Sequence, residues 1–144
     1  MFENMKFEDF KFEVIDIYSS GKPDIHITQN GITFTKKLIE DMGYPQYVVS
    51  ELDPEKKVLA IKVCKADNLN SIPFSKPKAE QTKAIQLSAA AIRLMLRGLM
   101  SDVWQDKNRY YMTGYWFADA KAMLFDLTTA KELPPYQIKK TSDR

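Results

Sequence analysis

The sequence predicts an α+β fold built from two related strand–helix–β-hairpin units. Residues 32–35 and 85–88 both read apolar, polar, apolar, hydroxyl, and each stretch leads into a helical pattern. Each helical pattern is followed by two β-rich runs that a turn separates. One such unit cannot bury its own sheet face and helix stripe, so we expect two units to pack about a pseudo-twofold axis.

The first unit spans residues 24–65 and contains a short helix. Thr35 is a suitable N-cap because its hydroxyl can accept from the free amides of the first helical turn. The helix is expected over residues 36–42, and Gly43 is placed to end it. Strands are expected over residues 24–28, 32–34, 47–52 and 58–63, and a further strand before the unit, over residues 10–18.

A polar connector over residues 66–82 leads to the second unit, residues 83–130. Ser88 is the expected N-cap of a long helix over residues 89–104. Its buried stripe is predicted from apolar residues at steps of three and four, namely Ile92, Leu96, Leu99 and Val103. Strands are expected over residues 84–87, 110–117 and 122–127.

Composition indicates one domain covering residues 1–144. The chain is 44% hydrophobic, which is enough for a core without metals or disulfides, and Cys64 is its only cysteine. The N-terminus mixes acids with aromatics and lacks the pattern of a signal peptide. The apolar-rich stretch 89–100 is broken by two arginines and is too short to span a bilayer. We therefore expect a cytoplasmic protein that does not engage membranes.

The residues that usually carry catalysis are sparse. His26 is the only histidine, and neither it nor Cys64 stands in a metal-ligand or nucleophile–base pattern. The five glycines are scattered and form no phosphate-binding loop. We expect no enzyme activity, no cofactor and no metal.

Residues 30–43 and the hairpin that follows resemble the AbrB/MazE-type swapped-hairpin family. Ile32, Phe34, Leu38, Met42 and Gly43 stand at positions that match the family pattern. Members are usually homodimers of one unit, so the resemblance implies a pseudo-dimer in this chain, with residues 84–127 as a diverged second copy. The whole chain also resembles uncharacterised bacterial proteins with a late pattern of Arg109-Tyr110, Thr113-Gly114 and Phe125-Asp126-Leu127.

The family resemblance implies a DNA-binding transcriptional regulator. Four basic residues are the candidates for contacts with DNA phosphates: Lys36, Lys37, Arg93 and Arg97. The two lysines begin a helix, where its dipole disfavours positive charge, and an anion would offset that conflict. A second basic group, Lys107 and Arg109, stands near several aromatic residues, a combination that can serve single-stranded nucleic acid.

The chain departs from the family pattern at the positions that contact DNA. Gly31, Ile39 and Glu40 stand where basic residues are usual, and Thr35 replaces a proline that often opens the helix. These departures motivate a second hypothesis: a non-enzymatic protein-interaction module, antitoxin-like or an assembly subunit, that has lost DNA binding. The expected partner is thus double-stranded DNA or another protein, and the oligomeric state stays open.

Overall fold

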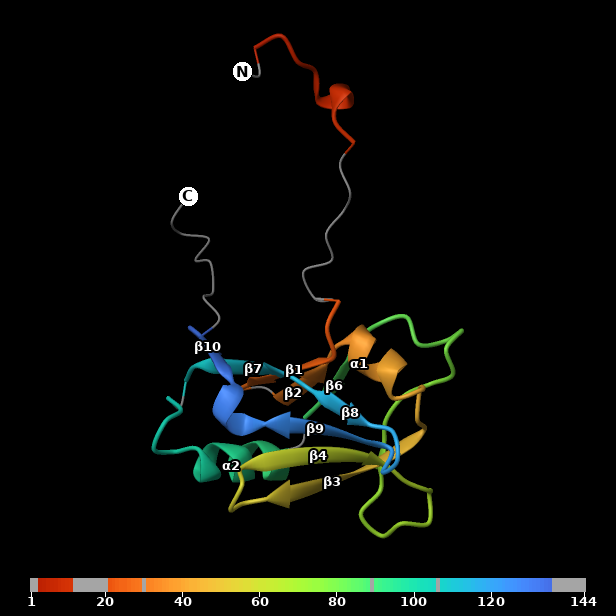
Figure 1. Ribbon diagram of the computed structural model, residues 1–144, viewed down its shortest axis with the longest axis vertical. Helices are drawn as coiled ribbons and strands as arrows, with labels where there is room; N and C mark the ends of the chain where they lie inside the picture. Colours follow the sequence, from red (N-terminus) through yellow and green to blue (C-terminus); the bar gives the residue numbers. More distant parts are fainter. Residues whose placement is uncertain (1–2, 12–20, 30, 89, 106, 136–144) are drawn as a thin grey trace.

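The computed structural model describes residues 3–11, 21–29, 31–88, 90–105 and 107–135. Figure 1 shows strands packed in layers, with α1 and α2 at different ends of the strand assembly. The helical elements of these residues are η1 (Phe7–Asp9), α1 (Lys36–Asp41), α2 (Ala90–Leu99) and η2 (Leu127–Thr129). The strands are β1 (Asp24–Thr28), β2 (Gly31–Phe34), β3 (Tyr47–Asp53), β4 (Val58–Val63), β5 (Ile72–Pro73), β6 (Ile85–Leu87), β7 (Arg109–Thr113), β8 (Tyr115–Phe117), β9 (Ala122–Asp126) and β10 (Lys131–Leu133).

The predicted α+β class, and with it the AbrB-like pseudo-dimer of strand–helix–hairpin units, is wrong. In the described residues the fold is mostly β, with ten strands in two five-stranded antiparallel sheets. The first sheet has the order β10-β7-β1-β2-β6, and the second has the order β5-β3-β4-β9-β8. Only two α-helices are present in this part of the chain, and α2 has ten residues where the sequence predicted sixteen.

The strands of the two halves of the chain are interleaved in both sheets. In the first sheet β1 pairs with β7, and β2 pairs with β6, with Thr33 opposite Gln86. In the second sheet β4 pairs with β9, with Ala60 opposite Leu124. A hairpin that stood alone would leave backbone groups unpaired at its edges, and pairing across the halves satisfies them. This is the physical reason why two self-contained units do not form.

The core lies between the two sheets, where alternate side chains of the strands point inward. The first sheet contributes Ile25, Ile27, Ile32 and Phe34, all buried. The second sheet contributes Val48, Leu59, Ile61, Met123 and Phe125, also buried. Because these inward positions are two residues apart, the intervening residues of each strand form the outer faces of the sheets.

The local prediction for α1 is confirmed. The Thr35 hydroxyl accepts a hydrogen bond from the Leu38 amide at 3.4 Å, as an N-cap does. The same oxygen accepts from the Asp24 amide at 3.0 Å and donates to the Lys22 carbonyl at 2.8 Å. Thr35 therefore joins the start of α1 to the start of β1.

Two predictions about element starts fall partly outside the described residues. The strand expected over residues 10–18 lies largely in the segment 12–20, and residue 89 separates Ser88 from the first described residue of α2. The described part of this helix begins at Ala90.

The strand expected over residues 110–117 bends at Gly114. Its first part, β7, belongs to the first sheet, and its second part, β8, to the second sheet. A Cβ at Gly114 would lie 2.6 Å from the Phe125 side chain and 2.7 Å from that of Met123. Glycine therefore allows the strand to pass close to β9 and cross between the sheets.

Candidate functional site

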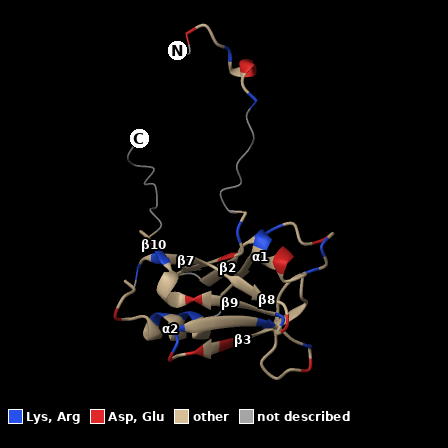
Figure 2. Cartoon of the chain, viewed as in Figure 1, with Lys and Arg blue, Asp and Glu red and all other residues tan. Residues whose placement is uncertain are grey.

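The four basic residues predicted to contact DNA do not gather at one place. Lys36 and Lys37 begin α1, which follows β2, whereas Arg93 and Arg97 belong to α2, which follows β6. Since β2 and β6 pair antiparallel, the two helices start at opposite ends of this strand pair. Figure 2 shows the basic residues of α1 and of α2 well apart.

Lys37 and Arg97 have partners within the fold. The Lys37 ammonium lies 2.9 Å from the Asp41 carboxylate, one helical turn away. The Arg97 guanidinium donates to the Gln105 carbonyl at 3.2 Å and to the Asn108 carbonyl at 2.9 Å, so it fastens the loop after α2. DNA binding through these four residues stays a prediction. The two pairs of basic residues lie apart and do not form one surface for DNA.

The aromatic residues near Lys107 and Arg109 are divided among different faces. Tyr110 is buried and Trp116 packs against the core, whereas Tyr111 lies on the outer face of the first sheet. Tyr115 lies on the second sheet. The single-stranded nucleic-acid interpretation required these rings on one surface, and the alternation of side chains along β7 and β8 places them on several.

A different surface emerges on the outer face of the second sheet. Tyr115 and Phe117 are the residues of β8 that point away from the core, with 69% and 46% of their surfaces exposed. Their rings contact edge to face, with centroids 5.0 Å apart. Leu124 lies opposite Tyr115 on β9, and Ala60 lies opposite Leu124 on β4. We call Val58, Ala60, Tyr115, Phe117 and Leu124 the apolar sheet face.

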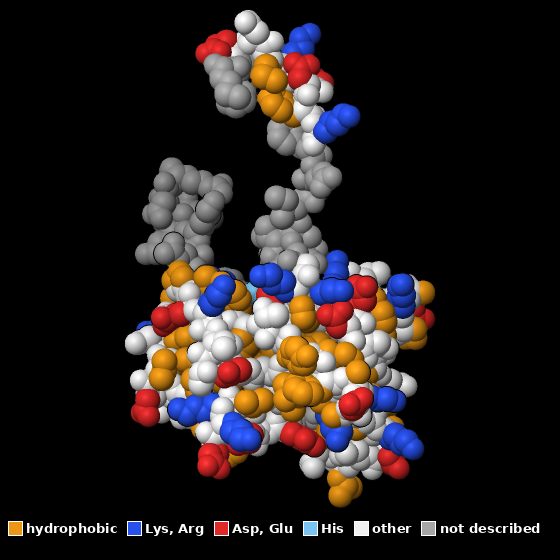
Figure 3. Space-filling model, viewed as in Figure 1, with side chains coloured by type: hydrophobic (Ala, Val, Ile, Leu, Met, Phe, Trp, Pro, Cys, Tyr) orange, Lys and Arg blue, Asp and Glu red, His pale blue; other side chains and the backbone are white. Residues whose placement is uncertain are grey.

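Charged residues surround this face. In the register of the second sheet, Glu51 lies opposite Ala60, and Asp126 lies opposite Val58. Lys62 lies opposite Ala122, which is itself opposite Phe117. Figure 3 shows apolar side chains gathered at the middle of the front of the molecule, over β8 and β9, with charged side chains around them. An apolar centre with a polar rim is the usual anatomy of a protein interface.

Strand β8, like β6 at the edge of the first sheet, lacks the usual protection of an outermost strand. Among the described strands, β5 ends in Pro73, which cannot donate to a new strand, and β10 carries Lys131 and Glu132. Strand β8 is Tyr115–Phe117, with neither charge nor proline. Natural edge strands usually carry one of these features to prevent pairing with another chain. The absence of charge and of proline from β8 supports an interaction surface on this side of the sheet.

His26 lies on the outer face of the first sheet and stacks on Tyr111, with ring centroids 5.6 Å apart. Burial lowers its pKa below the ordinary 6.5, and Arg109 lowers it further, while Asp24 opposes the shift. The folded protein therefore favours the neutral imidazole. Among the described residues no group of three or more His, Cys, Asp or Glu is arranged to hold a metal ion.

The lowered pKa of His26 gives a pH prediction. Because the unfolded chain binds this proton more readily, the contribution of His26 to stability is present above about pH 6.5 and is lost as the pH falls through that value toward the folded pKa. We expect the free energy of unfolding to fall more steeply between about pH 7 and 5 in the wild type than in His26→Gln. An NMR titration of this single imidazole checks the shift directly; a pKa at or above 6.5 contradicts it.

No helix within the described part of the chain is both long enough and apolar enough to cross a membrane. Comparisons with protein-family models, with curated proteins and with solved structures find no match for this chain. The resemblance to the AbrB/MazE-type family therefore stays a prediction.

Proposed function

We propose that the protein is a non-enzymatic assembly module that associates with a second copy of itself through the apolar sheet face. The observation that carries this proposal is the exposure of Tyr115 and Phe117, which lie side by side beside Leu124 on a sheet face. Large aromatic side chains are enriched at protein interfaces and supply most of the binding energy there. This favours the protein-interaction hypothesis over the DNA-binding one.

A second copy suits this face because its rim carries both signs of charge. Lys62 lies at one end of the face, and Glu51 and Asp126 lie along its other sides. In a twofold-symmetric dimer the same surface meets itself, so a rim with one sign of charge would repel its copy. A mixed rim instead allows Lys62 of one copy to approach a carboxylate of the other.

The size of the face sets the expected strength. Three strands spaced about 4.8 Å apart, each about four residues long at about 3.3 Å per residue, make a face of roughly 200 Å². This is well below the roughly 800 Å² per partner of standard stable interfaces. We therefore expect a weak dimer whose population depends on concentration.

The double variant Tyr115→Ser with Phe117→Ser is expected to remove self-association. Both side chains are largely exposed, so the free energy of unfolding should change by no more than about 1 kcal/mol. Sedimentation equilibrium from about 10 μM to 1 mM should show the wild type passing from monomer to dimer while the variant remains a monomer.

The matched control is Leu94→Ser with Met95→Ser, which removes two similarly exposed apolar side chains from α2. This control is expected to dimerise as the wild type does. A wild-type chain that stays monomeric up to about 1 mM overturns the proposal. Loss of the dimer in the α2 variant alone would also overturn it, because the interface would then lie on the helix.

A further inference from the structure

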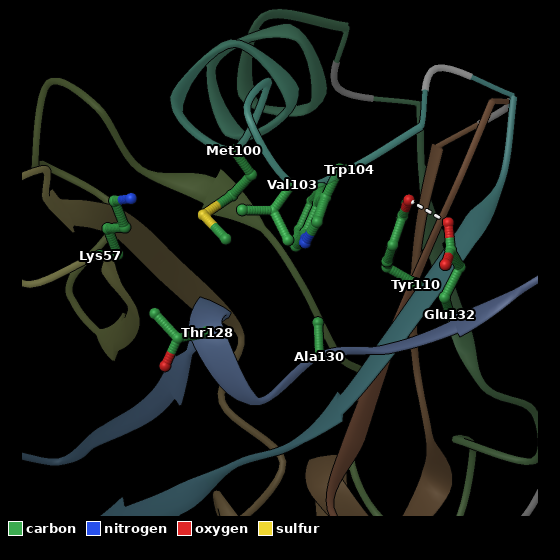
Figure 4. A pocket seen from close by; sticks show the side chains of 8 residues that line it. All are labelled: Lys57, Met100, Val103, Trp104, Tyr110, Thr128, Ala130 and Glu132. Atoms are coloured by element: carbon green, nitrogen blue, oxygen red, sulfur yellow. Dashed lines mark hydrogen bonds between the residues drawn. The ribbon is translucent and has the colours of Figure 1, made fainter.

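A separate hollow lies where the chain leaving α2 passes over η2 and β10, and it has a volume of about 230 Å³. Figure 4 shows Met100, Val103 and Trp104 on the helical side of it, with Thr128 and Ala130 on the facing side. Lys57, from the turn between β3 and β4, lines one end of the hollow, and Tyr110 with Glu132 lines the other.

The apolar wall of this pocket is held in place before any ligand arrives. Trp104 stacks on Tyr110 with ring centroids 4.4 Å apart and an interplanar angle of 9°. Both rings are buried, and so is Met100. Arg97 holds the loop between Trp104 and Tyr110 in place by donating hydrogen bonds to two of its backbone carbonyls. A preformed wall lowers the ordering cost of binding.

The two ends of the pocket differ in charge. Lys57 places an ammonium group at one end. At the other end Tyr110 donates to Glu132 at 2.7 Å, and the Asn108 amide donates to the same oxygen at 2.6 Å. These two hydrogen bonds lower the pKa of Glu132, so its carboxylate stays ionised at neutral pH. A ligand therefore meets a cation at one end and an anion at the other.

We propose that this pocket binds a small monocarboxylic acid whose apolar body is one aromatic ring or a short alkyl chain. The ligand carboxylate would pair with Lys57, and its apolar body would pack on Met100 and Trp104. An engineered apolar cavity of about 150 Å³ holds a benzene molecule, so a hollow of about 230 Å³ admits one ring with a short acidic arm. The Glu132 carboxylate would repel a second acidic group, which disfavours dicarboxylates.

The test uses 3-phenylpropionate as the probe and Trp104 as the reporter. The chain has two tryptophans, so Trp116→Phe leaves Trp104 as the only one. Affinity near the millimolar level is expected for a ligand of this size, so the titration runs to about 10 mM. We expect a saturable change in Trp104 fluorescence. Where Trp116→Phe does not fold, the indole N–H of Trp104 in the NMR spectrum of the wild type gives the same readout.

The contribution of Lys57 is measured against a matched lysine. Lys57→Met is expected to weaken binding roughly tenfold, because it removes a charge-assisted bond and keeps the alkyl stem. Lys121 is the control: it occupies the turn between β8 and β9 with nearly the same left-handed backbone, φ 50° against 57° at Lys57, but lies outside the pocket. Lys121→Met should bind as the wild type does.

Three results would overturn the proposal. The first is no saturable change up to about 10 mM. The second is equal affinity in Lys57→Met and the wild type. The third is equal affinity for 3-phenylpropionamide, which has the same body without the charge. Dimerisation can be followed in the same samples, and because the pocket and the apolar sheet face share no residue, failure of one proposal leaves the other standing.

Discussion

Replacing Thr35 with valine is expected to lower the free energy of unfolding by about 2–4 kcal/mol. The Thr35 hydroxyl accepts from the amides of Leu38 and Asp24 and donates to the carbonyl of Lys22. Valine has a similar shape but offers none of these bonds. Because position 35 is only 1% exposed, water has little access to replace them. Denaturant unfolding followed by circular dichroism measures the loss.

Thr35→Ser is the matched control, since serine keeps the hydroxyl and loses only a methyl group. We expect it to cost no more than about 1 kcal/mol. Equal losses in the two variants would show that packing of the methyl group, rather than hydrogen bonding, stabilises this corner.

Gly31→Ala is expected to cost about 3 kcal/mol or more. A Cβ at this position would lie 2.3 Å from the carbonyl oxygen of Leu87, a backbone atom of the paired strand β6. The backbone angle φ of Gly31 is +152°, which residues with side chains rarely adopt. Either β2 and β6 must separate or the first sheet must shift. Unfolding experiments give the energy, and amide exchange of β6 shows whether this strand is released.

Gly43→Ala separates backbone strain from steric clash. Gly43 also has a positive φ, +79°, but a Cβ there would meet nothing within 4 Å. Its substitution should cost about 1–2 kcal/mol through strain alone. A Gly31 variant as stable as the Gly43 variant would contradict the close approach between β2 and β6.

Local elements could be predicted from the sequence because neighbouring residues determine them. The N-cap at Thr35 and the hairpin of β3 and β4 were confirmed for this reason. The predicted end of the second helix, at residue 104, was wrong because the apolar period continues to Val103, whereas α2 ends at Leu99. The Val103 side chain is 64% exposed, and the chain has already turned so that Trp104 can stack on Tyr110.

The pairing partners of the strands could not be predicted because they are distant in the sequence. Nothing near Ile25 indicates that it pairs with Met112, and nothing near Leu59 indicates Phe125. Without these pairs each half resembles a complete unit. The α+β prediction followed from that resemblance.

The late sequence pattern that suggested a relationship to uncharacterised proteins has structural roles in this fold. Arg109 donates to the carbonyl of Pro134, and the Thr113 hydroxyl donates to the Asp24 carboxylate. Asp126 caps η2 by accepting from the Thr128 amide. Residues of this kind fix the fold, and they say little about what the surface binds. The apolar sheet face was missed because its outward residues alternate with core residues and resemble them in type.

The interleaving of the two sheets has a consequence for how the chain is made. During synthesis the first half emerges with β1, β2 and β4 lacking the neighbours that residues 85–126 supply. These strands stay exposed at their edges until the ribosome has released most of the second half. Folding must therefore close long loops late, which is slow in mostly β proteins. The nascent chain depends on β6, β7 and β9 to complete its sheets, and a stop shortly before β9 yields a product with an open sheet and a tendency to aggregate.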